Sequence, residues 1–293
     1  LTVWPNVETW EGLTRLANTD VSTIAESMNG VPFLAEQSMY LPSRDGSLGG
    51  GVAASGATAP ALQWYFAEGA TAAPLESYLL IANPDAQRAA RVRATYWRGD
   101  GASFEREFVV EPLQRYTVAV AAESFAGVPG QPLANAASVA ARVTSDNGVP
   151  IVAERSVWWA ANPSSGSWTE GHRSFGMPTP GTSWAFAEGE VGGPQDTDTY
   201  VLVLNASDTD GSIRVKALPE SGSPVERTFP LQARARVTVS MRAAFPELLN
   251  TRFGLLVSSL GASPAPIVVE RSMYTNDRVP LRTGTASAGV RLQ

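Results

Sequence analysis

The sequence predicts an all-β protein built from tandem immunoglobulin-like β-sandwich modules. Apolar and polar residues alternate with a period of two along many short segments, which is typical of strands with one buried face. Glycine and proline, 26 and 21 of the 293 residues, separate these segments as turn formers. Several segments also recur in the same order further along the chain, which predicts more than one copy of the same module.

The expected elements follow from these patterns. Residues 91–96 alternate, so Val92, Ala94 and Tyr96 would share one face of a strand and Arg91, Arg93 and Thr95 the other. The Asp-Gly pair at 100–101 and the Asn-Gly pair at 147–148 follow such segments and are expected to form β-hairpin turns, because these residues tolerate positive φ. The segment 241–250 is the clearest candidate for a short helix.

The internal repeat defines the expected domains. The motif W-x-F-A-E-G begins at Trp64 and again at Trp184, and each copy opens a module, at 61–181 and at 182–293. The other matching segments are 77–85 with 199–207, 90–108 with 212–229, 115–120 with 236–241, 150–159 with 266–275, and 171–176 with 284–289.

Residues 1–60 contain only the second half of a module. Residues 29–41 resemble 147–159 and residues 51–56 resemble 171–176, but the counterpart of residues 64–115 is missing. A half module would leave an uncovered apolar face and unpaired strand edges. We expect upstream sequence or another subunit to complete it, or residues 1–60 to pack on the module that follows.

Composition excludes some classes of function. The net charge is −6 and no segment concentrates Lys or Arg, so a nucleic-acid partner is not expected. The chain has no cysteine, which excludes disulfides and thiolate metal sites. No apolar segment reaches the length of a membrane span.

Glutamates mark two positions of the repeat. A carboxylate pair could serve glycoside hydrolysis. A motif that recurs in tandem copies is more typical of structure, so we interpret these carboxylates as structural and expect arginines of the repeat to bind them. The residues of this structural motif are Trp64, Glu68, Trp184, Glu188, Glu36, Glu154, Arg155, Glu270 and Arg271.

The other candidates for chemistry are weak. Asp208 and Asp210 resemble part of a calcium loop, but the full ligand spacing is absent and a turn is preferred. His172 is the only histidine and is expected to be a solvated loop residue. Asn205 begins a glycosylation sequon. No catalytic residue, metal or cofactor is expected.

Tryptophans are the candidates for a sugar-binding platform. Trp4, Trp97, Trp158, Trp159 and Trp168 could stack on a glycan if they were exposed together. Packing within and between modules is the preferred interpretation, because the tryptophans of the W-x-F-A-E-G motif recur at the module boundaries.

The motifs carry a resemblance to a known repeat. The order W-x-F-A-E-G, N-P, R-x-T-V and I-V-x-E-R-S resembles a β-repeat family of unassigned function in secreted and cell-surface proteins of Chloroflexota and Actinobacteria. Two departures are Leu204–Ser207, which replaces the A-N-P-D of residues 82–85, and Gln37, which replaces the arginine at 155 and 271. The resemblance implies an exported surface or stalk module and no catalytic activity.

The sequence therefore predicts a non-enzymatic extracellular structural protein, a subunit of a surface layer, stalk or filament. Its expected partners are copies of itself or neighbouring modules. A glycan-binding or adhesion module, with cell-envelope glycan as the partner, is the alternative.

Overall fold

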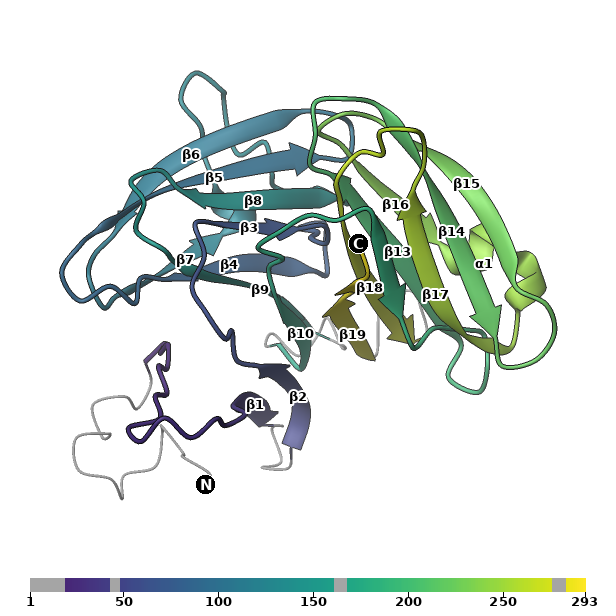
Figure 1. The fold of residues 1–293 in the computed structure, drawn as a ribbon, viewed down its shortest axis with the longest axis horizontal. Helices are drawn as coiled ribbons and strands as arrows, with labels where there is room; N and C mark the ends of the chain where they lie inside the picture. Colours follow the sequence, from purple (N-terminus) through teal and green to yellow (C-terminus); the bar gives the residue numbers. More distant parts are fainter. Residues whose placement is uncertain (1–18, 43–47, 161–167, 276–282) are drawn as a thin grey trace.

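The computed structural model describes residues 19–42, 48–160, 168–275 and 283–293, and confirms the prediction of an all-β protein. Strands account for 53% of the structure and helices for 4%. The described strands form several antiparallel sheets, arranged as two sandwich-like bodies with a separate hairpin beside the first (Figure 1). Trp4 and the other residues 1–18 lie outside the described part.

The N-terminal hairpin consists of β1 (Glu36–Pro42) and β2 (Leu48–Ser55). It pairs with no further strand in the described residues, but β2 lies against β10 of the first sandwich (Figure 1). The described segment before it, residues 19–35, contains no strand.

The first sandwich comprises strands β3 to β10. One sheet has the order β3-β8-β5-β6 and the other the order β10-β9-β4-β7. The strands are β3 (Gln63–Phe66), β4 (Glu76–Ala82), β5 (Ala90–Arg98), β6 (Ser103–Val110), β7 (Arg115–Ala119), β8 (Val139–Ser145), β9 (Val152–Trp159) and β10 (Glu170–Phe175), with the 3₁₀ turn η2 (Val120–Ala122) after β7.

The second sandwich comprises strands β11 to β20. One sheet has the order β15-β14-β17-β11-β20, with β12 paired to β17, and the other the order β16-β13-β18-β19. The strands are β11 (Ser183–Phe186), β12 (Glu190–Val191), β13 (Thr197–Asn205), β14 (Gly211–Pro219), β15 (Val225–Leu231), β16 (Arg236–Ser240), β17 (Thr251–Ser259), β18 (Ile267–Thr275), β19 (Thr283–Ala288) and β20 (Val290–Arg291). The expected helical segment holds α1 (Met241–Ala244) and η4 (Pro246–Leu248).

Each sandwich has its own apolar core between its two sheets. Leu79 and Ile81 of β4 face Val92 and Ala94 of β5 across the first core. The alternating burial of β4 and β5 explains this, because every second side chain of a strand points to the same face. The second core is built in the same way from β13, β18, β14 and β17.

The two turn predictions had different outcomes. The Asp-Gly pair at 100–101 joins the paired strands β5 and β6, and Gly101 has φ 90°. The Asn-Gly pair at 147–148 forms a turn with φ 71° at Gly148, but the prediction of a hairpin there is wrong, because β8 and β9 belong to opposite sheets. The Asn147 side chain accepts from the N–H of Arg91 and donates to the carbonyl of Ala89, which directs the chain across the sandwich.

The sequence repeat is also a repeat of strand register. Hairpins β1-β2, β9-β10 and β18-β19 pair their strands with the same offset. In each hairpin an aromatic ring lies over a glycine of the facing strand, where a Cβ would collide with the ring or be pressed closely against it. The aromatic and glycine pairs are Tyr40 with Gly51, Trp158 with Gly171, and Tyr274 with Gly284.

In the described residues, no helix has the length and apolarity needed to cross a membrane.

Candidate functional site

The most unusual group of side chains lies where the two sandwiches meet. The loop after β3 and the strands β9 and β10 of the first sandwich contact β18 and β19 of the second (Figure 1). Two carboxylates, an arginine, a histidine and two serines are buried there. We call this contact the joint, defined by Glu68, Arg155, His172 and Ser174 of the first sandwich and Glu270, Ser272 and Tyr274 of the second.

The loop that carries Glu68 is fixed by a strand hydroxyl. Ser77 of β4 accepts from the N–H of Ala70 and donates to the carbonyl of Ala70. Thr199 makes the same two bonds to Glu190 in the second sandwich. Both F-A-E-G loops therefore hold their glutamate at the same end of the sandwich.

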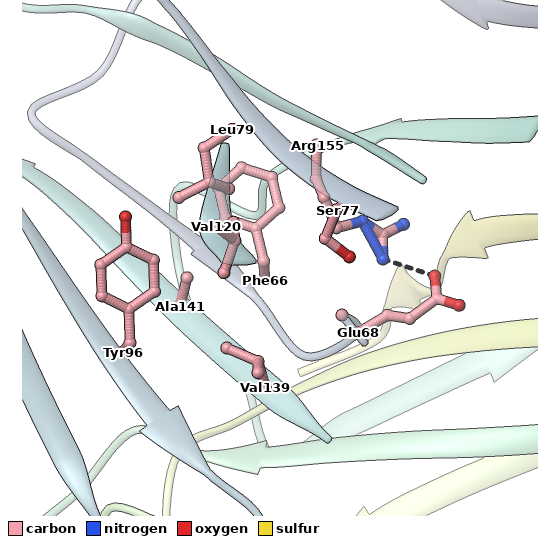
Figure 2. A pocket seen from close by; sticks show the side chains of 10 residues that line it. Phe66, Glu68, Ser77, Leu79, Tyr96, Val120, Val139, Ala141 and Arg155 are labelled. Atoms are coloured by element: carbon pink, nitrogen blue, oxygen red, sulfur yellow. Dashed lines mark hydrogen bonds and ion pairs between the residues drawn. The ribbon is translucent and has the colours of Figure 1, made fainter. Parts of the chain in front are cut away.

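Glu68 accepts hydrogen bonds from both sandwiches. Arg155 donates to its Oε2 at 2.5 Å (Figure 2), and Ser272 and Tyr274 of β18 donate to its Oε1, Tyr274 at 3.1 Å. The backbone N–H of Glu68 in turn donates to Oε2 of Glu270 at 2.7 Å. The motif glutamates of two successive modules thus meet at one point.

Arg155 and Ser174 complete the contact around Glu270. Ser174 donates to Oε1 of Glu270 at 2.7 Å and accepts from Arg155 at 2.9 Å. The second amino group of Arg155 lies 3.5 Å from the same carboxylate oxygen. One arginine therefore bridges the two buried carboxylates, which satisfies much of the charge that burial would otherwise penalise.

The joint holds its ionisable groups far from their usual pKa values. Burial alone would raise the pKa of Glu68, but Arg155 and the hydrogen bond from Ser272 hold it at about 2. Burial raises the pKa of Glu270, against the opposing effect of Arg155. Glu68 is therefore ionised at neutral pH.

His172 is buried in the joint, so the expectation of a solvated loop histidine is wrong. It is 4% exposed, and its Nε2 lies 2.8 Å from the hydroxyl of Tyr274 and 3.5 Å from Oε1 of Glu68. The physical reason is that β10 directs His172 inward, against the ring of Trp159. Burial lowers the pKa of His172 to about 4, so the imidazole is neutral at neutral pH.

A second arginine crosses the joint from the other side. Arg236 of β16 donates to the carbonyl oxygens of Gly69, at 2.8 Å, and Val139, at 3.3 Å. Burial lowers the pKa of Arg236 to about 10, partly offset by Glu68 and Glu270. The arginine remains charged at neutral pH and balances the acidic pair.

Apolar side chains surround the polar centre. Tyr65, Ala67 and Trp97 of the first sandwich pack against Leu202 and Val268 of the second, among a small buried cluster. A pocket of about 10 Å³ lies beside Arg155 and Glu68 (Figure 2), with room for about one water molecule. The joint is thus packed like a domain core.

The second sandwich repeats half of this arrangement, and no partner for it lies among the described residues. Glu188 is bound by Arg271, which donates to its Oε2 at 2.8 Å and to its carbonyl oxygen at 3.0 Å. The side chain of Glu188 is 69% exposed, whereas that of Glu68 is 6% exposed. A pocket of about 180 Å³, lined by Glu188, Leu218 and Met273, opens beside it.

The N-terminal hairpin meets the first sandwich through the corresponding residues. Arg173 donates to Gln37 at 2.7 Å and lies 2.6 Å from Glu154. Gln37 occupies the position of Arg155, and Glu154 that of Glu270. The cation of this contact therefore comes from the sandwich, which offsets the glutamine in the hairpin.

The remaining motif residues lie as follows. The indole N–H groups of Trp64 and Trp184 donate to the carbonyls of Ile151, at 2.8 Å, and Ile267, at 3.0 Å, inside their own sandwiches. Glu36 is exposed on the hairpin.

The candidates for metal binding and glycosylation are engaged with the protein. Asp208 forms an ion pair with Arg234, and Asp210 accepts from the N–H of Ala233. The described residues contain no group of three or more acidic or histidine side chains suited to a metal ion. Asn205 is fully buried and its side-chain nitrogen donates to two carbonyls, so this nitrogen faces away from solvent.

Sequence reasoning missed the roles of His172, Ser174, Ser272 and Arg236. The serines recur in the I-V-x-E-R-S and G-x-x-S motifs, so the repeat contained a signal for two of them. His172 gave none, because the residues at its position in the other hairpins are Val52 and Thr285.

The comparisons with known proteins return weak structural likenesses. No protein family matches the chain, and no curated protein matches it. It is similar to a crystal structure of Thermotoga maritima 1070, with 15% identity and a TM-score of 0.33, over 38% of this chain and 95% of that one. It is also similar to the Anabaena sensory rhodopsin transducer, with 26% identity and a TM-score of 0.27, over 32% of this chain and 97% of that one.

The arrangement at the joint is suited to holding modules together. Its serines are bonded to carboxylates, and its carboxylates to an arginine and to backbone or hydroxyl donors. Such a network fixes the orientation of the two surfaces, because each donor must meet its acceptor.

Proposed function

We propose that the chain is a non-enzymatic structural protein of the cell surface, a subunit of a layer, stalk or filament made from immunoglobulin-like β-sandwich modules. The observation that carries the proposal is that the motif residues of the repeat build the joint between sandwiches. Glu68 and Glu270 come from the two motif positions, and the backbone N–H of Glu68 donates to the carboxylate of Glu270 across two modules.

The burial of the joint supports a mechanical role for these carboxylates. Glu68 and Glu270 are 6% and 1% exposed, and both bind the same arginine. A carboxylate that acts on a substrate must reach it, whereas a carboxylate that orients two modules must be satisfied inside the contact. The resemblance to repeats of secreted and cell-surface proteins points to the same location.

Labelling of intact source cells tests the proposal. An antibody raised against residues 61–293 is expected to label unpermeabilised cells along a continuous layer or filament, and a protease added outside should remove the label. Labelling that requires permeabilisation would overturn the cell-surface proposal.

A glycan-binding module is the second candidate, and one observation favours it. Trp168 is 40% exposed, stacks on Trp158 with ring centroids 5.9 Å apart, and contacts Tyr78. Trp97, Trp158 and Trp159 are buried. If Trp168 binds sugar, the chain should bind glycans on an array, and Trp168→Ala should abolish this binding although the buried Trp97 and Trp159 are unchanged in that variant.

A further inference from the structure

Two complementary faces of the chain have no partner among the residues that the structure describes. One is the open end of the second sandwich, defined by Ala187, Glu188, Leu218, Arg271 and Ser287. The other is the outer face of the N-terminal hairpin, defined by Leu34, Glu36, Ser38, Tyr40 and Ala53. We propose that copies of this chain join head to tail, with the hairpin face of one copy seated on the open end of the next in the geometry of the joint; this partner assignment rests on the proposed structural function.

The open end has the binding groups that the first sandwich brings to the joint. Glu188 and Arg271 match Glu68 and Arg155 in sequence and pair in the same way. Ser287 faces Arg271 across the hairpin, as Ser174 faces Arg155. The end is therefore built to receive a second glutamate and two hydroxyl groups.

The hairpin face has the groups that the second sandwich brings to the joint. Glu36, Ser38 and Tyr40 occupy the positions of Glu270, Ser272 and Tyr274, because the two hairpins share one register. Tyr40 also lies over Gly51 as Tyr274 lies over Gly284, so its hydroxyl has the same support. The three hairpin residues are exposed, whereas their counterparts are buried.

The charges of the two faces match. At the joint the arginine is Arg155 of the first sandwich, and the second sandwich has Ala286 at the position of Arg173. At the hairpin contact the arginine is instead Arg173, opposite Gln37. The open end has Arg271, and the hairpin face has Ala53 at the position of Arg173, so the pair reproduces the charge arrangement of the joint without two facing arginines.

The apolar rim is also present on both faces. Leu34 is 99% exposed at the position of Val268, which is fully buried in the joint. Leu218 is 37% exposed and occupies the position that Trp97 has at the joint. Leu218 pairs with Gly254 of β17 as Trp97 pairs with Ala140 of β8. Covering these side chains would remove apolar surface from water, which favours association.

Sedimentation of residues 1–293 tests the proposal. A head-to-tail contact between unlike faces adds further copies, in a filament or a ring, so the mass should rise with concentration beyond the 31.0 kDa of one chain. Ser38→Arg blocks the hairpin face and Ala187→Arg blocks the open end, and both sites are exposed. Each variant alone is expected to weaken self-association at least about tenfold.

Mixing the two variants gives the sharper result. The Ser38→Arg chain keeps its open end and the Ala187→Arg chain keeps its hairpin face, so an equimolar mixture should form a dimer and nothing larger. The matched controls Ser103→Arg and Ala86→Arg place the same charge on exposed sites outside both faces and should polymerise normally. Circular dichroism melts establish that all four variants are folded.

A monomer at every concentration, or a mixture that stays monomeric, would overturn the proposal. Self-association that is unchanged in both Ser38→Arg and Ala187→Arg would also overturn the proposal, because it would show non-specific contact between exposed apolar residues. A chain that is monomeric yet labels intact cells refutes only the head-to-tail contact. A chain that polymerises but labels only permeabilised cells refutes only the surface function.

Discussion

The same glutamate of the repeat has two different environments in one chain. Glu68 is buried with hydrogen bonds from three side chains, and Glu188 is exposed with one arginine. Breaking a buried ion pair costs far more than breaking an exposed one, because burial leaves the remaining charge without water. The two positions therefore provide a matched comparison within one protein.

Replacing Glu68 by Gln should destabilise the chain far more than the same change at Glu188. Glu68→Gln leaves Arg155 without its closest charge partner and should cost about 3 kcal/mol. Glu188→Gln should cost less than about 1 kcal/mol. Urea unfolding in the Ser38→Arg background measures both without self-association, and equal losses would contradict a structural role that is specific to the joint.

Acidification should weaken the protein through His172. Its pKa is about 4 in the folded chain and 6.5 in the unfolded chain, so between these values only the unfolded chain binds the proton. The free energy of unfolding should therefore fall by about 2–3 kcal/mol as the pH falls from 7 to 4.5. His172→Gln should remove this change in the urea midpoint, and an unchanged pH profile would contradict it, since the chain has no other histidine.

Glu68 should extend the acid sensitivity to lower pH. Its folded pKa of about 2 lies below its usual value of 4.5, so its contribution to stability is present above pH 4.5 and is lost as the pH falls towards 2. Protonation of Glu270 acts in the opposite direction, because burial raises its pKa. A steeper loss of stability below pH 4.5 that disappears in Glu68→Gln would identify the first effect.

At the scale of elements, the recurring unit is a hairpin in which an aromatic ring covers a glycine. A Cβ at Gly284 would lie 2.5 Å from the ring of Tyr274, and one at Gly51 would lie 3.0 Å from Tyr40. The glycine therefore sets where the ring rests. At the joint, this places the Tyr274 hydroxyl against Glu68 and His172.

Adding one methyl group at Gly284 should disturb the joint as well as the hairpin. Gly284→Ala forces the Tyr274 ring to move and should cost about 1–3 kcal/mol. Gly211→Ala is the control, because a Cβ there meets only Ala265 at 3.5 Å, and it should be nearly neutral. Thermal melting compares the two, and equal melting temperatures would show that the ring has room.

At the scale of the whole molecule, the joint and the hairpin contact have the same geometry, but the arginine comes from the preceding unit at the joint and from the following unit at the hairpin contact. Arg155 serves the joint from the preceding unit, and Arg173 serves the hairpin contact from the following unit. Arg115 of β7 repeats the placement of Arg236 of β16, since it reaches back to Asp20 at 2.9 Å. Each sandwich thus uses an arginine of this position to bind the unit that precedes it in the chain.

The exchange of the cation can be tested by rebuilding the hairpin contact. Arg173→Ala leaves Glu154 unpaired and should cost about 2 kcal/mol, whereas adding Gln37→Arg to it should restore at least about half of the loss. Gln37→Arg alone should destabilise, because it faces Arg173. Strictly additive effects in the urea midpoints would contradict the equivalence of the two contacts.

Sequence reasoning reached the strands and the repeat but not the joint. Alternation along β4 and β5 depends on neighbours in the chain, so it is visible in the sequence. The bond from Glu68 to Glu270 joins residues 202 positions apart and depends on how two sandwiches dock. The Asn-Gly turn at 147–148 shows the same limit, because its local signal is compatible with crossing to the other sheet.

The link between the sandwiches leaves the chain almost no slack. Met177 pairs with Tyr65 of the first sandwich and Gly181 pairs with Ile267 of the second, so residues 178–180 alone separate the two anchors. Three residues span about 10 Å at full extension. A pull along the chain would therefore load the joint and both anchoring bridges at once, and the two sandwiches would move under tension as one rigid segment.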